Sequence, residues 1–299
     1  MTAAHDRFRV LDRQPFVSTA SDATLRGVLG TVVDVARRRD LLGMLVRRDL
    51  KARYKDSALG VVWTLVRPLV QLLVYYVVLG KFLGAERGID NFAIYIFSGL
   101  VAYGLFSEII ASATNSILGN AGLVKKVYLP RAIFPLASIG SALFNFAMQL
   151  VILLAATLLT GAFPLHADLA YAIPGLALLL LYGYAFGLLL SALNVYFRDV
   201  GYLVEVVLLL MLWASPIVYA WTFVRDALGP GVLLEIYTDN PVTLAVLAFH
   251  KAFWTSGDDA MYPESLLLRI GIAFLAGLAI LMVSQFVFAR LQGNFAQEL

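Results

Sequence analysis

Cysteine is absent from this chain of 299 residues, and histidine occurs only three times. The absence of cysteine excludes disulfides and thiolate metal sites. The three histidines, His5, His166 and His250, are far apart in the sequence, and no two of them have metal-ligand spacing. A glycine-rich phosphate loop of the GxxxxGKS/T form is also missing. We therefore expect no nucleotide hydrolysis, no cofactor and no metal in this chain.

Charged side chains are scarce as well. They make up 14% of the residues, against about 25% in a typical soluble domain, while hydrophobic residues make up 61%. A soluble fold of this length cannot bury so much apolar surface, so most of it must face lipid or other membrane helices. The composition predicts an integral membrane protein. We assign the net charge of +3 to membrane topology and not to nucleic-acid binding.

Six stretches are long and apolar enough to cross about 30 Å of hydrocarbon as helices. They are residues 59–83, 92–113, 133–160, 171–193, 203–223 and 266–289. The stretch 241–254 is apolar but too short to cross, which favours a re-entrant or surface-lying helix within the connection 224–265. The sequence thus predicts an all-α membrane protein, with a cytoplasmic N-terminal region at 1–58 and a six-span domain at 59–299.

Most lysine and arginine residues lie before the first span and in the loops after the second and fourth spans. Basic residues beside membrane helices stay on the cytoplasmic side. Since the number of spans is even, both termini are expected in the cytoplasm.

Two amphipathic patterns precede the first span. Residues 25–36 place apolar side chains on one helical stripe, which predicts a helix lying along the cytoplasmic membrane surface or one packed on a partner. Leu42, Val46, Leu50 and Tyr54 follow at steps of four and predict a second short helix.

Arg67 and Glu108 stand out as ionisable residues within predicted spans, where charge is costly and points to function. Counted at about 1.5 Å per residue, their depths from the cytoplasmic side agree to within one helical turn. We predict that they face each other or share a polar cavity. A purely structural link between two helices is an alternative that the pattern leaves open.

Aromatic residues are frequent in or near the spans. Those considered as the lining of a path for an amphipathic solute are Tyr75, Tyr103, Phe106, Trp213 and Tyr219. Aromatic rings at span ends also form the usual interfacial belt, which is the competing interpretation. Tyr103 and Phe106 lie away from both ends of their span, so the belt explains these two least.

The loop NSILGNAGLVKKVYLPR (115–131) between the second and third spans is short and basic, and glycine and proline interrupt it. It predicts one or two helical turns at the cytoplasmic surface. Such an element presents Leu123 and Val124 beside Lys125 and Lys126, either as a contact for a soluble partner or as an ordinary inside loop.

Five segments resemble, in order, the ABC-2 type permeases that export cell-surface polysaccharides such as O-antigen, teichoic acid and capsule. The segments are RRDLKARYKDSALGVVW (47–63), NAGLVKKVYLPRAIFPLA (120–137), NVYFRDV (194–200), SPIVY (215–219) and NP (240–241). The likeness covers about residues 40–295.

This resemblance implies a homodimeric permease of the bacterial cytoplasmic membrane that serves cell envelope biogenesis. Two separate ATP-binding cassette subunits would bind ATP and Mg, and the cargo would be a polyprenyl-diphosphate-linked polysaccharide of O-antigen, teichoic acid or galactan type. On the family pattern, residues 21–55 would be interface helices and 224–265 would hold the outer gate helices. The coupling helix would lie at about 115–127, with Ser116, Leu123, Val124, Lys125 and Lys126 at the ATPase contact.

Two other functions stay open at this point. One is an ABC-2 exporter of a drug or a lipid, which shares the six spans. The other is a polytopic membrane transferase, which predicts activity of the chain alone and a cluster of acids or histidines at one leaflet; the sequence shows no such cluster.

Overall fold

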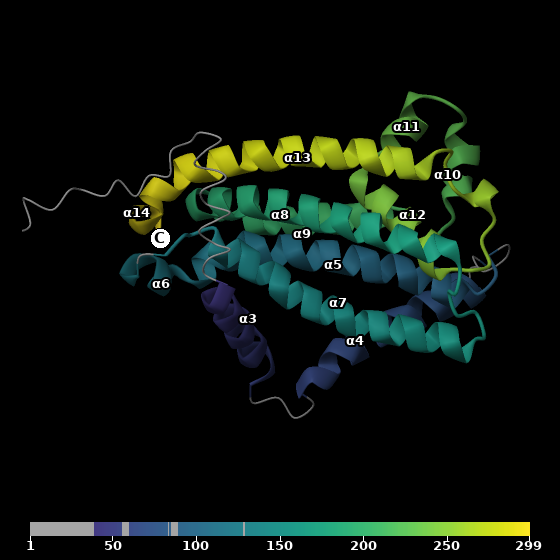
Figure 1. The fold of residues 1–299 in the computed structure, drawn as a ribbon, viewed down its shortest axis with the longest axis horizontal. Helices are drawn as coiled ribbons and strands as arrows, with labels where there is room; N and C mark the ends of the chain where they lie inside the picture. Colours follow the sequence, from purple (N-terminus) through teal and green to yellow (C-terminus); the bar gives the residue numbers. More distant parts are fainter. Residues whose placement is uncertain (1–38, 56–59, 83, 85–88, 128) are drawn as a thin grey trace, which may run out of the picture.

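The computed structural model describes residues 39–55, 60–82, 84, 89–127 and 129–299, and these residues form helices and no β-strand (Figure 1). The predicted surface helix at 25–36 lies outside this range. The helices are α3 (Arg39–Tyr54), η1 (Gly60–Val62), α4 (Trp63–Val74), η2 (Tyr75–Phe82), α5 (Phe92–Gly119), α6 (Ala121–Lys126), α7 (Ile133–Leu159), η3 (Ala167–Tyr171), α8 (Ala172–Tyr196), α9 (Val200–Trp213), α10 (Trp221–Leu228), α11 (Val232–Thr238), α12 (Pro241–Phe253), η4 (Asp259–Met261), α13 (Leu266–Leu291), η5 (Gln292–Asn294) and α14 (Phe295–Glu298). The all-α prediction is confirmed.

Four long helices form the body of the molecule. α13, α8, α5 and α7 lie side by side in that order, and α12 packs against α5, α8 and α13 (Figure 1). α5 and α8 approach closely because two glycines of α8 face α5. A Cβ atom added at Gly187 would lie 2.7 Å from the Cβ of Ala113, and one at Gly183 would lie 2.9 Å from Ile109. Small residues at such contacts let membrane helices pack backbone to backbone.

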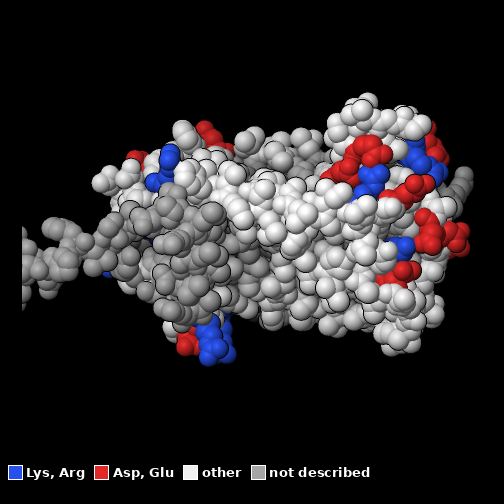
Figure 2. All heavy atoms as spheres, turned by 45° about the horizontal axis from the view of Figure 1, so that its top comes forward, with Lys and Arg blue, Asp and Glu red and all other residues white. Residues whose placement is uncertain are grey.

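Five described helical segments are long and apolar enough to cross a membrane: Trp63–Phe82, Phe92–Gly119, Ile133–Leu159, Ala167–Tyr196 and Asp259–Glu298, the last of which contains α13. A sixth is added if α11 and α12, bent by 67° at their junction, count as one span. Figure 2 shows charged side chains gathered toward both ends of the visible face, with an uncharged band between them. That distribution is what a bilayer requires.

The predicted span at 203–223 is not one helix. α9 ends at Trp213 after 14 residues, about 21 Å of helix, and α10 begins only at Trp221. Pro216 explains the break, because proline lacks the N–H that a continuing helix needs. The hydroxyl of Tyr95 lies 3.1 Å from the carbonyl oxygen of Pro216 and 2.9 Å from that of Tyr219, so it satisfies backbone that the break leaves free.

α12 occupies the short apolar stretch that the sequence placed at the surface or in a re-entrant segment. Its residues 242–250 are all buried, which rules out the surface-lying alternative. The helix begins where expected: Pro241 stands in the first turn, and the Asn240 side chain accepts a hydrogen bond from the backbone N–H of Val242 at 3.0 Å.

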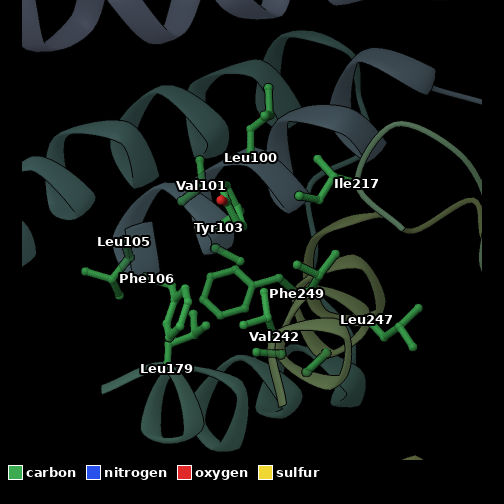
Figure 3. Close-up of a cluster of buried hydrophobic side chains, with 14 of the residues drawn as sticks. Leu100, Val101, Tyr103, Leu105, Phe106, Leu179, Ile217, Val242, Leu247 and Phe249 are labelled. Atoms are coloured by element: carbon green, nitrogen blue, oxygen red, sulfur yellow. The ribbon is translucent and has the colours of Figure 1, made fainter. Parts of the chain in front are cut away.

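The main hydrophobic core joins α5, α8 and α12 with the broken segment after α9. Phe106 of α5, Leu179 of α8 and Phe249 of α12 meet there, and Ile217 closes the cluster from the broken segment (Figure 3). A second, smaller core lies at the end of the molecule that holds α6 and α14.

Candidate functional site

The short helix α6 lies at the tip of the molecule, between α5 and α7. Val124 is buried and Leu123 partly buried in the second core, which also contains Phe295 of α14. Lys125 and Lys126 are exposed on the opposite side. The helix is therefore anchored by its apolar face and presents its basic face outward.

Two expectations about this loop need correction. Ser116 does not belong to the tip helix: it lies near the end of α5, is buried, and donates a hydrogen bond to the carbonyl of Ala113 at 2.7 Å. Helix α5 continues to Gly119 because Ala113, Thr114, Ser116 and Ile117 are buried against the rest of the fold, which an apolar window does not show. Val124 points into the core, so the surface open to a partner is formed by Lys125 and Lys126 together with Gly122 and Val127.

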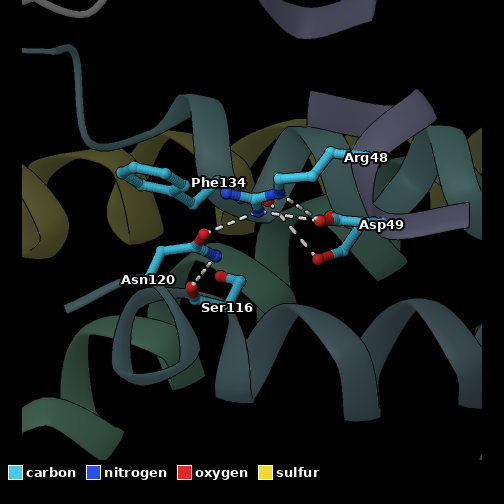
Figure 4. A network of polar contacts seen from close by, with 6 residues as sticks. Arg48, Asp49, Ser116, Asn120 and Phe134 are labelled. Atoms are coloured by element: carbon cyan, nitrogen blue, oxygen red, sulfur yellow. Dashed lines mark hydrogen bonds and ion pairs between the residues drawn. The ribbon is translucent and has the colours of Figure 1, made fainter. Parts of the chain in front are cut away.

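Arg48 ties α3 to the junction between α5 and α6 (Figure 4). Its Nη2 donates to Oδ1 of Asn120 at 2.6 Å, and the Asn120 amide donates to the carbonyl of Ser116 at 2.8 Å. The same guanidinium pairs with Asp49 at 2.7 Å. The tip and α3 are thus joined by side chains as well as by the core.

Five residues further along α3, Arg53 reaches the middle of α5. Its Nη1 lies 2.6 Å from Oε1 of Glu108, and Nδ2 of Asn145 on α7 donates to the same oxygen at 2.5 Å. The Glu108 side chain is only 22% exposed, whereas that of Arg53 is 40% exposed, so the ion pair is half-buried at the carboxylate and open to solvent at the guanidinium. One carboxylate therefore connects three helices.

A cavity of about 300 Å³ opens beside this ion pair. Its polar wall consists of Arg53, Arg67, Glu108, Asn145 and Gln149, and Trp63, Thr64 and Pro68 of α4 complete it. Arg67 and Glu108 thus line one cavity, although the ion pair of Glu108 is made with Arg53. Within the described part of the chain, Arg67 has no ion pair, and its side chain is exposed.

The five aromatic residues do not come together on one surface. Tyr103 and Phe106 are buried in the main core (Figure 3), and the Tyr103 hydroxyl donates to the carbonyl of Leu208. Their position away from the span ends reflects packing, so assigning them to an open path is not supported. Trp213 is half exposed, and Tyr219 donates to its carbonyl at 2.6 Å across the broken segment. Tyr75 is partly buried in η2.

Comparison with known proteins identifies the family of this chain. The family model described as ABC-2 type transporter matches residues 40–254. The chain belongs to the ABC-2 type transporter family. It is 26% identical to the O-antigen export system permease protein RfbA of Klebsiella pneumoniae, over 87% of this chain and 95% of that protein. It is 28% identical to the protein of the same name from Myxococcus xanthus, over 75% of this chain and 84% of that protein. The chain is a permease of an ABC-2 type exporter, a class of transport subunit.

In this ABC-2 permease, Arg53, Asn145 and Gln149 are site residues that the sequence reasoning missed. In the sequence, Arg53 belongs to the basic region before the first span and to the segment 47–63, with no sign of a contact to Glu108. Asn145 and Gln149 carried a signal, since they are uncharged polar residues one helical turn apart in an apolar span. A search limited to ionisable groups passes over them.

Proposed function

We propose that this permease is the membrane-spanning subunit of an ATP-driven exporter that moves a polyprenyl-diphosphate-linked polysaccharide out across the bacterial cytoplasmic membrane. The observation that carries the proposal is the similarity to O-antigen export permeases, which extends over 95% of the Klebsiella protein. A likeness of that extent includes the spans and the tip helix together, not one shared segment. Cargo of the same chemical class is the simplest consequence.

The geometry of α6 supports a docking site for an ATP-binding cassette subunit, which would bind ATP and Mg. Lys125 and Lys126 face outward, while Val124 and the neighbouring Phe295 hold the helix to the body. Arg131 lies with its guanidinium 5.6 Å from the Phe295 ring and adds a further contact at the same place. A helix that is seated firmly and charged on its outer side can pass a displacement into the membrane domain.

α3 provides the route for that displacement. It is one helix of 16 residues, joined to the tip through Arg48 and to the polar cavity through Arg53. A movement of α6 therefore reaches Glu108 through a single rigid element. In this proposal, nucleotide binding on the partner biases the cavity between two arrangements.

A second copy of the chain completes the path. In the span Trp63–Phe82 only 6% of the apolar window is buried by the rest of the chain, yet this span carries Arg67. Arginine in a transmembrane helix faces a bundle interior or water, because lipid contact is costly. We therefore place α4 toward a partner copy and a water-filled path, with Tyr75 and Trp213 as the aromatics still available to line it.

The experiment is reconstitution of the permease with its ATP-binding cassette partner in proteoliposomes. We expect ATPase activity to rise on addition of an undecaprenyl-diphosphate-linked oligosaccharide and to stay unchanged with hydrophobic drugs or phospholipid. Stimulation by drugs alone would indicate an exporter of drugs or lipids. Glycosyl or acyl transfer by the permease without the partner would indicate a membrane transferase.

Docking at α6 is tested separately with charge reversal. The variant Lys125→Glu with Lys126→Glu should keep normal amounts of folded permease and lose most of the stimulated ATPase activity. Arg198→Glu is the matched control, since Arg198 is an exposed basic residue in another loop, between α8 and α9. Equal activity of the α6 variant and this control would remove the docking assignment while leaving the cargo assignment untouched.

A further inference from the structure

A hollow of about 410 Å³ lies at the end of the molecule opposite α6. Its walls come from the loop after α7, from η3, from the end of α12 and from the segment that leads to η4. Figure 1 places these elements together with α10 and α11, far from the tip. Under the proposed function, exported cargo would leave the permease at this end. The inference that follows rests on that function.

Two polar atoms at this hollow have no hydrogen-bond partner among the described residues. Tyr262 is more than nine-tenths buried, and its hydroxyl is unpaired; Nε2 of His166 is buried and unpaired in the same way. Both residues line the hollow. Buried polar atoms in proteins are almost always paired with protein groups, water or a ligand, so these two are open to a hydrogen bond from water or from a ligand hydroxyl.

The hollow is lined by one lysine and two aspartates. Lys251 Nζ lies 2.8 Å from Oδ1 of Asp259 and above the rings of Tyr171 and Tyr262, at 4.9 Å and 5.5 Å from their centres. Asp168 adds a second carboxylate to the wall. The site therefore offers hydrogen-bond donors and acceptors side by side, with one carboxylate more than it has cations. Hydroxyl groups, which both donate and accept, suit such a surface better than a phosphate or a fatty chain does.

Trp254 gives the same hollow an aromatic wall. The indole is almost fully buried, and its Nε1 donates to the carbonyl of Asp90 at 2.5 Å, so the ring is fixed in place. A fixed ring next to a few convergent polar groups is the usual composition of a small-molecule site. Gly257 lies against this ring, since a Cβ atom added there would come within 2.5 Å of it, so the ring supports the wall of the hollow and leaves its face covered.

A second hollow of about 740 Å³ adjoins the first. The two share Lys251, Asp259 and Tyr262, which stand between them. A ligand that uses these three residues can extend to both sides. A chain of several sugar units has this shape, whereas a single metal ion or a monosaccharide would occupy one side only.

We propose that the two hollows bind a short segment of a neutral glycan chain, with hydroxyl groups hydrogen-bonded to Tyr262, Asp259 and Lys251. The site would hold the leading sugars as they emerge from the permease. It lies within one chain, so each copy would carry its own.

The test is binding of neutral oligosaccharides to the full-length permease in nanodiscs, measured by saturation-transfer NMR and titration calorimetry. The probes are unbranched chains of four to six galactose, mannose or glucose units, without a lipid. We expect one of the three series to bind saturably. Tyr262→Phe should raise the Kd for that series at least five-fold and leave the thermal stability of the permease unchanged. That variant removes only the unpaired hydroxyl, so no bond of the fold is lost. Tyr202→Phe on the exposed face of α9 is the matched control and should bind like the parent.

Three results would overturn the site: no saturable binding of any series, an unchanged Kd in Tyr262→Phe, or displacement of the oligosaccharide by millimolar calcium alone. The binding assay needs no ATPase and no lipid carrier. Export of a lipid-linked glycan by a permease that binds no oligosaccharide would reject this site alone. Oligosaccharide binding by a permease that exports none would reject the proposed function instead.

Discussion

The first and second membrane spans are similarly apolar but differ in what surrounds them. In Phe92–Gly119, 78% of the most apolar window is buried by other parts of the chain, against 6% in Trp63–Phe82. The second span is the axis of the fold, since α7, α8 and α12 all pack on it. The first span contributes little to that core, although it carries Arg67 and part of the polar cavity. Burial within one chain thus separates a helix that stabilises the fold from one that the rest of the described chain leaves largely uncovered.

The largest effect is expected where the second span is packed most closely. Gly187→Leu should abolish accumulation of folded permease, because even a Cβ at this position comes within 2.7 Å of Ala113 on α5. Gly271→Leu on α13 is the control, since a Cβ there meets nothing within 4 Å. The measurement is the yield of monodisperse protein after detergent extraction. Similar yields for both variants would mean that the contact between α5 and α8 does not hold the fold together.

The next effect concerns the ion pair that links the second span to α3. Glu108→Gln should reduce export at least ten-fold at near-normal yield, because it leaves Arg53 and Arg67 without a carboxylate at the cavity. Arg53→Gln should have a similar effect. Export assays on the two single variants and the double variant give the coupling between the two residues.

In that cycle, a double variant no worse than either single one is expected. Simple addition of the two losses would show that Arg53 and Glu108 act independently. The same cycle on Arg67 and Glu108 tests the pairing that the sequence predicted. Both residues line one cavity, and the cycle measures whether they are coupled.

A smaller effect is expected at the outer part of α3. Arg48→Ala removes the hydrogen bond to Asn120, but the side chain is 43% exposed, so stability should change by no more than about 1 kcal/mol. ATPase stimulation by cargo should fall about two- to five-fold, since the link between the tip and α3 is weakened. Asp49→Ala, which leaves the bond to Asn120 in place, should retain more stimulation; the reverse order would contradict the route through Arg48.

The smallest effect tests the surroundings of the first span without changing transport. The chain lacks cysteine, so a single introduced cysteine is unique. Val74, on the same face of the first span as Arg67, and Leu275 of α13 are 46% and 68% exposed. Val74→Cys should react with a water-soluble maleimide in the membrane, while Leu275→Cys should be protected by lipid. Equal protection of both would place the first span against lipid.

Sequence predicted the helical fold and the spans that contain no break, because the length of an apolar run decides whether a helix can cross lipid. It failed at 203–223, where hydropathy continues across Pro216 although the helix does not. It left Tyr103 and Phe106 as candidates for a path or an aromatic belt, since hydropathy does not distinguish a ring in a core from one in a channel.

The polar cavity combines residues that the sequence singled out with one that it did not. Depth counting brought Arg67 and Glu108 to one level of the membrane, and both line the cavity. The ion pair of Glu108 with Arg53 spans 55 residues of sequence and depends on how α3 packs on the body. Such packing is set by tertiary contacts, which one sequence without its structure does not contain.

The most direct measurement is movement of a fluorescent undecaprenyl-diphosphate oligosaccharide across proteoliposomes that hold the permease with or without its ATPase partner. The account predicts movement only when permease, partner and hydrolysable ATP are all present, and its loss on reversing the charge of Lys125 and Lys126. Movement driven by the permease alone, or unaffected by that charge reversal, would contradict the account.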